Sequence, residues 1–440
     1  MIELARARAF WFRRQGLASP SREDPAKVIR ATGWLRTLGG ADVYLAARAR
    51  TAALDRASMD RAVANDQLRV IPAVRGCIYL VPGVDVPWVL RLAEEAWRPR
   101  TEREVEKVGA TWKEVEALAK LVEKALAKPM TTDAIRRALP DGAVRSLGDA
   151  GKKLGMSSLL PIALRLLEFA DRIERTLDGG RLDTERYTWR VVRDRAPVTG
   201  DPRAKLAETF FAHNGPARVT DFASWAAWSQ RDAKAAMASI DLASVTVEGL
   251  GDAFVLARDR AALESAEPSD AIALLSFEDN FLVAHGGPAL VTDPAYHAVE
   301  LMPWGSGKPE AIGTANHIAS RTIVAGGQVV GLWELDEPAK AGVWAPLGAR
   351  AVDAKRAKEI EARVQDAAHF LLDELGHGKS FSLDTSESIA DRAAQIKLLR
   401  GKRAASASPS GASRSSRAPT ASASRRGSTR AAPRRSRTRG

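Results

Sequence analysis

Histidines and a short glycine–lysine–serine run are the first places to look for chemistry in this chain, because such side chains bind metals and phosphates. The six histidines form no pair with three residues between them, and none lies near a cysteine cluster, so their spacing predicts no zinc site. Gly378, Lys379 and Ser380 are similar to the end of a phosphate-binding loop. Such a loop needs a glycine where Asp373 stands and follows a strand, whereas this run follows a predicted helix, so we exclude it.

Acidic side chains gather in the segment SFEDN, where Glu278 and Asp279 adjoin, and Asp270 comes shortly before them. Paired carboxylates can serve as general acid and general base. A polar run of this kind beside a predicted strand is more often a turn, so the spacing favours a structural role. The chain has no Gly-x-Ser-x-Gly, which argues against a hydrolase whose nucleophile sits on that strand-to-helix turn.

Length, cysteine content and hydropathy limit the number of domains and the cell compartment that can be expected. The chain has 440 residues, too long for one ordinary domain, and 45% of them are hydrophobic, which is enough for several cores. Its one cysteine, Cys77, excludes a disulfide within the chain and fits a reducing compartment. No apolar run is long enough to span a membrane, and the N-terminal residues lack a signal-peptide core, so we expect a cytoplasmic protein.

The net charge of +12 is distributed unevenly. Residues 401–440 contain eleven basic residues and no acidic one, so residues 1–400 carry a net charge of only about +1. This terminal stretch is Ser, Ala, Arg, Pro and Gly almost throughout, and we predict that it is disordered. It either attracts phosphates in a salt-sensitive way or only aids solubility.

One order of elements recurs three times in the body: a helix, a short helix, a longer helix, then two strands. The middle copy is the clearest, and an amphipathic helix opens it. Thr131 or Thr132 can cap its short helix, and Ser157 or Ser158 can cap the longer, apolar helix that follows. A turn around residues 178–180 then joins two strands, which we interpret as the hairpin, or wing, of a winged helix.

The other two copies show the same order less regularly. The third copy begins near Asp201, with Thr220 capping its second helix and a hairpin that turns at residues 249–251. In the N-terminal copy, residues 25–38 and 41–53 are predicted helices ahead of a strand pair. The sequence thus predicts an α+β fold of tandem winged-helix units, then a small β-rich domain. The expected divisions are a first unit at 1–98, a second at 99–196, a third at 197–265, the β-rich domain at 266–345, a helical segment at 346–400 and the disordered tail at 401–440.

A winged helix can place one helix in the major groove of DNA and its hairpin against the backbone or the minor groove. Three such units side by side could surround a duplex, so we predict binding to double-stranded DNA. Each basic residue of the middle unit could instead be an ordinary solvated side chain, and winged helices also bind proteins. Four arginines of that unit are the predicted phosphate contacts: Arg165, Arg172, Arg181 and Arg186.

Five segments, in order along the chain, resemble one protein family. They are RVIPAVRGCIYLVPGVDVPW, LLPIALRLLEFADRIERTLDGGRLDTERYTW, GPARVTDFASWAAW, SFEDNFLVAH and RTIVAGGQVVGLWELDE. Over residues 1 to about 375 the chain resembles the AlkZ/YcaQ-type winged-helix DNA glycosylases. The resemblance implies a concave array of three winged helices closed by a β-barrel-like domain. It also implies hydrolysis of the N-glycosidic bond of alkylated bases, or unhooking of crosslinks, without a metal or an organic cofactor.

The family's catalytic motif, Gln-x-Gln or Gln-x-Asp, falls in the stretch LRTLGGADVYLAARAR. That stretch is short here, and Gly39, Gly40 and Ala41 stand where polar side chains are expected. By the resemblance, Asp42 alone could supply a catalytic carboxylate that orients water beside the sugar; otherwise it caps the following helix. We therefore weigh three functions: a glycosylase, an inactive DNA-binding relative, and a winged-helix protein that binds other proteins.

The first hairpin also departs from the family pattern, because Cys77 and Tyr79 occupy the positions of its threonine and histidine. Tyr79 either stacks on a base as a wedge or packs in the core as a strand residue. We expect Arg75 to touch a phosphate and Trp225 to lie in the core. We further expect a nucleoid-associated monomer that uses no metal or small-molecule cofactor and has no membrane partner.

Overall fold

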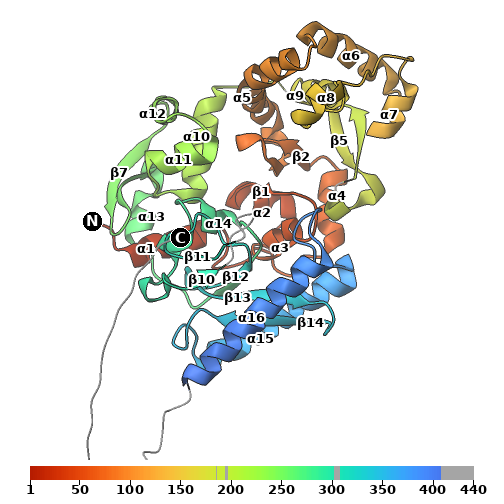
Figure 1. The fold of residues 1–440 in the computed structure, drawn as a ribbon. Coiled ribbons are helices and arrows are strands. Elements are labelled where there is room, and N and C mark those ends of the chain that lie inside the picture. The colour runs from red at the N-terminus through yellow and green to blue at the C-terminus, as the bar shows by residue number, and fades with distance from the viewer. Residues whose placement is uncertain (185, 194–196, 302–307, 408–440) are drawn as a thin grey trace, which may run out of the picture.

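The computed structural model describes residues 1–184, 186–193, 197–301 and 308–407, and it shows a mixed α/β chain with several small sheets (Figure 1). Most of the predicted disordered tail, residues 408–440, lies outside the described residues. Residues 401–407 differ from the expectation, because they form the last part of a long C-terminal helix.

The first repeat follows helix α1 (Leu4–Arg14) and forms a three-stranded sheet. The helix predicted over residues 25–38 is too long, because Gly33, with φ of 110°, ends it and residues 35–36 form a strand. Asp24 and Asp55 cap two of its helices by accepting backbone N–H groups, as short acidic side chains do at a helix start. The elements are α2 (Pro25–Thr32), β1 (Leu35–Arg36), α3 (Asp42–Arg48), α4 (Arg56–Ala64), β2 (Leu68–Pro72) and β3 (Ile78–Pro82), and the sheet order is β1-β3-β2.

The middle repeat has the same order of elements, with one extra short helix, and its sheet order, β4-β6-β5, is equivalent. Thr131 caps its second helix, in agreement with one of the two predicted choices. Neither Ser157 nor Ser158 caps the longer helix, which starts after Leu159 without a side-chain cap. The elements are α6 (Trp112–Ala125), β4 (Met130–Thr131), α7 (Thr132–Ala138), α8 (Gly148–Lys153), α9 (Leu160–Phe169), β5 (Ile173–Leu177) and β6 (Tyr187–Val191).

The third repeat replaces the first short strand with a single antiparallel bridge between Ala217 and Phe254. Its hairpin turns between residues 247 and 251, as predicted. Thr220 is not the cap of its second helix, because that helix begins at Val219 and the Asp221 carboxylate accepts the backbone N–H of Arg218 instead. The elements are α10 (Pro202–Asn214), α11 (Val219–Ala226), α12 (Gln230–Met237), β7 (Leu242–Val247) and β8 (Gly251–Leu256).

The C-terminal part contains a four-stranded antiparallel sheet in the order β14-β13-β12-β9. This sheet is open, and among the described residues it closes into no barrel, which differs from the expected barrel-like domain. The predicted long helix over residues 353–375 is present as α15 followed directly by a π-helical turn, Phe370–Leu375. The elements are α13 (Arg260–Glu264), β9 (Ile272–Leu275), α14 (Asn280–Val283), β10 (Glu300–Leu301), β11 (Glu310–Ala311), β12 (Arg321–Ala325), β13 (Gln328–Asp336), β14 (Ala341–Pro346), α15 (Ala354–His369) and α16 (Ser386–Ala407).

Four hydrophobic cores show how these parts are joined. The middle repeat has a core of its own, and it stands apart at the upper right of Figure 1, connected through the long helix α5 (Val86–Lys107). A second core joins the first repeat to the four-stranded sheet and α15. A third core joins the third repeat to α1 and to that sheet. A fourth core joins the third repeat to the first hairpin and to α5. The first repeat therefore lies at the junction of every other part, and its predicted catalytic stretch lies there with it.

Candidate functional site

Asp42 is the first residue of α3, and it neither caps that helix nor faces solvent. The cap position is Ala41, and no side-chain cap bond is formed. The Oδ1 atom of Asp42 accepts two N–H bonds from Arg321, at 3.0 and 2.7 Å, and its Oδ2 atom accepts the backbone N–H of Phe277 at 2.6 Å. Asp42 is only 8% exposed. Both carboxylate oxygens are thus occupied by protein donors.

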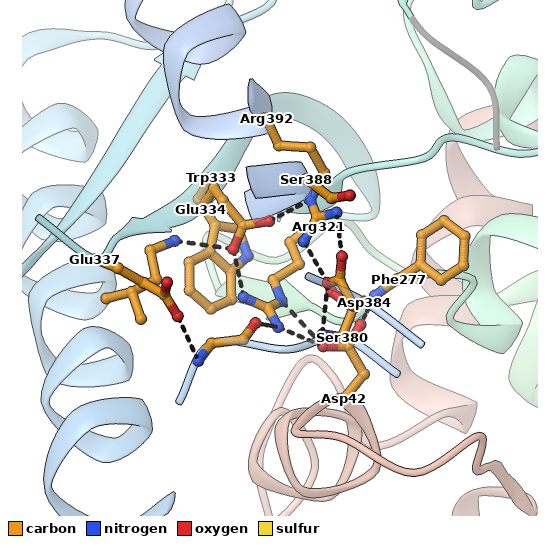
Figure 2. Close-up of polar contacts among 12 residues, drawn as sticks. Asp42, Phe277, Arg321, Trp333, Glu334, Glu337, Ser380, Asp384, Ser388 and Arg392 are labelled. Atoms are coloured by element: carbon orange, nitrogen blue, oxygen red, sulfur yellow. Dashed lines mark hydrogen bonds and ion pairs between the residues drawn. The ribbon is translucent and has the colours of Figure 1, made fainter. Parts of the chain in front are cut away.

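The Asp42 carboxylate belongs to a chain of buried ion pairs that Figure 2 shows. Arg321, which is fully buried, also donates to Glu334 at 2.5 Å. The other oxygen of Glu334 accepts from Arg392 on α16 at 2.7 Å, and Arg392 donates in turn to Asp384 at 2.7 Å. Three carboxylates therefore alternate with two guanidinium groups, and they connect the first repeat, the sheet and the C-terminal helix.

Two other parts of the chain hold the residues directly before Asp42. The backbone N–H of Gly40 donates to the carbonyl of Asp183, between β5 and β6, at 2.8 Å. The backbone N–H of Ala41 donates to the carbonyl of Lys379 at 2.7 Å. A Cβ atom on Gly40 would lie 2.7 Å from both that carbonyl and the backbone N of Phe381, so a larger side chain has no space here. Where the family motif carries polar side chains, this chain has a tightly packed backbone junction.

Electrostatics at this junction favour structural ion pairs. Burial raises the pKa of Asp42 above its ordinary value, although the charge and hydrogen bonds of Arg321 act in the opposite direction. Burial also opposes the charge of Asp183, but hydrogen bonds from Arg181 and His377 outweigh it and lower the pKa of Asp183 to about 2. His377 lies 3.0 Å from that carboxylate. Asp183 is thus an ionised anchor between the middle repeat and the C-terminal segment.

The first hairpin carries Arg75 at its tip, and Tyr79 in β3 is buried. Arg75 is exposed in the turn between β2 and β3, with φ of 58°, a left-handed conformation that is unusual for a side chain of this size. It donates a hydrogen bond to the hydroxyl of Tyr79 at 3.0 Å. The Tyr79 ring is 1% exposed and packs edge-on against Trp34. The structure agrees with the interpretation of Tyr79 as a strand residue that packs in the core.

The four arginines of the middle unit differ in how far they are already engaged. Arg165 is half-buried over the ring of Phe169 and lies 3.7 Å from Glu168. Arg172 forms an ion pair with Glu123. Arg181 is paired with Asp183 and donates to the carbonyl of Leu375 at 2.8 Å, whereas Arg186 is exposed. Three of the four guanidinium groups therefore already lie against carboxylates, each against a different one.

The remaining sequence candidates have separate structural partners. Asp270, Glu278 and Asp279 form no acidic pair, because each is paired with a different arginine: Arg356, Arg36 and Arg50. Trp225 is 8% exposed and lies in a core, as expected. Within the described part of the chain, no group of three or more His, Cys, Asp or Glu residues could hold a metal ion. No helix in that part is long and apolar enough to cross a membrane.

Sequence reasoning missed the partners of Asp42. Arg321 and Glu334 are charged residues in strands made mostly of apolar residues, and charged residues are rarely buried unless they are paired. That signal could have marked them as members of a buried network. Nothing in the sequence indicates which carboxylate Arg321 meets, because Asp42 lies 279 residues away.

Comparisons with known proteins agree with the predicted family. A family model described as DNA glycosylase AlkZ-like matches residues 32–370. Among solved structures, Streptomyces sahachiroi DNA glycosylase AlkZ is similar with a TM-score of 0.64 and 20% sequence identity, over 86% of this chain and 97% of that chain. No curated protein matches. Since the family model spans well over half of the sequence, this chain belongs to the AlkZ-like DNA glycosylase family.

Proposed function

We propose that this protein binds duplex DNA through three winged-helix repeats and acts in DNA repair as a glycosylase-like protein. The observation that carries the proposal is the threefold recurrence of one element order, with the same three-stranded sheet order in the first two repeats and a single bridge in place of the short strand in the third, within a chain of a DNA glycosylase family. A winged helix has this order, and it offers a helix and a hairpin to the grooves of DNA. The similar solved structure is itself named as a DNA glycosylase.

The proposed reaction is hydrolysis of the N-glycosidic bond of an alkylated base, or of a crosslink, in duplex DNA. Such chemistry needs a water molecule beside the sugar and a group that stabilises an electron-poor sugar. It needs no organic cofactor or metal ion. We also keep as proposals that the protein acts as a monomer, and that it lies in the cytoplasm on the nucleoid.

A second candidate, duplex binding without base excision by this motif, has a specific observation in its favour. Both oxygens of Asp42 accept hydrogen bonds from buried donors, and Gly40 has no space for the side chain that the family motif would place there. A general base needs a free oxygen within reach of water. The geometry of this turn therefore supports Asp42 as a structural residue.

Arg75 and Arg186 are the proposed phosphate contacts with the least competition from carboxylates. Both are exposed. Arg75 lies at the hairpin of the first repeat, where the hydroxyl of Tyr79 accepts its hydrogen bond, and Arg186 lies at the hairpin of the middle repeat. Arg165, Arg172 and Arg181 would first have to weaken their present pairs. Phosphate contacts of this kind position a protein on DNA without selecting a sequence.

Base release from a duplex that contains 7-methylguanine tests the proposal, with binding to the same duplex measured in parallel. Release above a blank, with saturable binding, supports glycosylase function. Binding without release supports the second candidate. An absence of binding at low ionic strength, where phosphate contacts are strongest, would contradict both.

A further inference from the structure

Arg8 is the most deeply buried arginine of α1, and it has no carboxylate partner. Its residue is 6% exposed. On the same helix, Arg6 forms an ion pair with Glu267, and Arg14 forms one with Asp259. Arg8 forms no ion pair within the described part of the chain. A buried charge is costly unless it is paired and hydrogen-bonded, so the positive charge of Arg8 is poorly balanced by the protein itself.

Two backbone carbonyls satisfy only part of the Arg8 guanidinium. Its Nε atom donates to the carbonyl of Leu290 at 2.6 Å, and its Nη2 atom donates to that of Thr292 at 3.1 Å. Burial lowers the pKa of Arg8 below its ordinary value, and the charges of Asp293 and Glu248 offset this only in part. Nη1 has no acceptor among the described residues, so it is the donor that remains for a ligand.

Arg8 lines a cavity of about 300 Å³ that lies between α1, the segment before β9, the β12–β13 turn and α15. A second guanidinium, that of Arg356 in the first turn of α15, lines the same cavity. Ser269 and Gln328 add a hydroxyl and an amide to the residues around it. A cavity of this size and polarity has room for a small polar molecule.

The charges around this cavity leave an excess of one positive charge. Arg8 and Arg356 contribute two positive charges and Asp270 one negative charge. Asp270 is paired with Arg356 at 2.6 Å, but its side chain is 96% exposed, and a pair with so exposed a partner is weak. An oxyanion in the cavity would accept charge-assisted hydrogen bonds from both guanidinium groups, and such bonds are among the strongest in proteins.

The turn between β12 and β13 packs closely on α1 and fixes one wall of the cavity. A Cβ atom on Gly327 would lie 2.9 Å from the carbonyl oxygen of Arg8. The backbone N–H of Gly326 donates to the carbonyl of Ala271 at 3.0 Å, which ties the turn to the segment before β9. Donors that are held in place before binding lose less entropy when a ligand arrives.

We propose that this cavity binds a small oxyanion, with the chemistry of a phosphate or carboxylate group, through Arg8 and Arg356. Because Arg8 is only 6% exposed, a free small molecule fits better than a backbone phosphate of a duplex, which carries a sugar on each side. None of the elements of the three repeats lines the cavity, so this site goes beyond the proposed function and does not depend on it.

Titration of the full-length protein with inorganic phosphate at constant ionic strength, followed by calorimetry, tests the site. Ala5 is exposed, lines the cavity and lies three residues before Arg8, on the same face of α1. Ala5→Glu therefore places a carboxylate where the oxyanion would bind, and Ala5→Gln is its matched control of nearly equal size. Ala5→Glu should bind phosphate at least about tenfold more weakly than Ala5→Gln does.

Arg356→Gln tests the second guanidinium, and Arg363→Gln is its control, since Arg363 forms an ion pair with Glu359 on the same helix. Arg356→Gln should weaken phosphate binding about fivefold or more, and the control should not. Asp270→Asn should strengthen it about twofold or more, because a competing carboxylate is removed. Arg8→Gln is unsuitable as the sole test, because it also removes the two bonds from α1 to backbone carbonyls.

The basic residues at 401–440 are the same in every variant, so only differences between variants report on the cavity. Equal affinity of Ala5→Glu and Ala5→Gln, or of Arg356→Gln and Arg363→Gln, would overturn the proposal. Acetate that binds with the same dependence on these variants would identify a carboxylate ligand, and phosphate alone would identify a phosphate ligand. An excess of undamaged duplex should leave the difference between the two Ala5 variants in place; its loss would contradict a small-molecule ligand.

Discussion

Asp42 illustrates how a residue can match a chemical expectation by type and position while its contacts are those of a buried ion pair. Its carboxylate stands in the expected stretch, yet it accepts three N–H bonds from protein donors and is buried. A buried carboxylate that is paired in this way stabilises a junction between distant segments, and removal of one member leaves the other buried without a partner. The stretch around Asp42 could be found from the sequence, but the partners that decide its role could not.

Asp42→Ala should lower the free energy of unfolding by about 2–4 kcal/mol, because Arg321 and the Phe277 N–H lose an acceptor inside the protein. Asp42→Asn should lower it by less than half as much, since the amide keeps an acceptor oxygen and burial already raises the pKa of Asp42. Denaturant unfolding of the three proteins measures both effects.

The control for this prediction is Asp270→Ala, at an exposed partner of Arg356, which should leave stability unchanged. Neither Asp42 variant should alter base release or duplex binding while the protein stays folded. Loss of release in Asp42→Asn at full stability would contradict the structural role and restore Asp42 as a catalytic carboxylate.

At the scale of elements, local sequence signals predicted individual helices and hairpins, but the sequence did not predict the contacts between them. The apolar periodicity and the turn residues located the middle and third repeats, including the hairpins that end them. Gly33 and the short β1 strand show where periodicity failed, because a strand of two residues has no pattern of its own. The contact of residues 181–183 with the first repeat could not be predicted from the sequence either, because it depends on partners more than a hundred residues away.

Tyr44 tests that inward contact. Its hydroxyl donates to Asp60 at 2.5 Å and accepts the backbone N–H of Leu182 at 2.9 Å, so it connects α3, α4 and the loop after β5. Tyr44→Phe should lower the free energy of unfolding by about 1–3 kcal/mol, because two buried polar groups lose a partner. The loss should exceed that of Tyr79→Phe, which removes one bond from an exposed arginine. A smaller loss in Tyr44→Phe than in Tyr79→Phe would mean that this loop contributes little to the junction.

At the scale of the whole molecule, stability should fall as the solution becomes acidic. Burial, with the charges of Arg14 and Arg50, lowers the pKa of His213 from 6.5 to about 4, so the unfolded chain binds a proton there more readily. This contribution is present above pH 6.5 and is lost as the pH falls through about 4. Asp183 acts with the same sign from its ordinary 3.8 down to about 2. Asp42 and Asp60 act with the opposite sign, since burial raises their pKa values.

His213→Gln isolates one part of this dependence. The variant should lose less stability than the unaltered protein between pH 6.5 and 4, as measured by denaturant midpoints across that range. His369→Gln, at an exposed histidine on α15, controls for the loss of an imidazole. Parallel curves for the unaltered protein and His213→Gln would show that His213 does not contribute to acid sensitivity.

The distribution of charge bears on which part of the protein would bind DNA under the proposed function. Residues 1–400 are nearly neutral, and many described arginines of that region are paired with carboxylates, so the proposed binding of duplex by the repeats would depend on the local placement of a few cations. A chain ended after Ala407 loses nine arginines and keeps α16: Arg414, Arg417, Arg425, Arg426, Arg430, Arg434, Arg435, Arg437 and Arg439.

We expect the shortened chain to bind duplex at low ionic strength, more weakly than the full chain and with a shallower dependence on salt. The slope of log affinity against log salt should fall by about 0.9 for each phosphate contact that is lost. A full-length variant with these arginines replaced by glutamine controls for length and should behave like the shortened chain. If the shortened chain has no affinity for duplex at low ionic strength, the repeats do not bind DNA, and the basic residues of the terminal stretch account for all binding by the full chain.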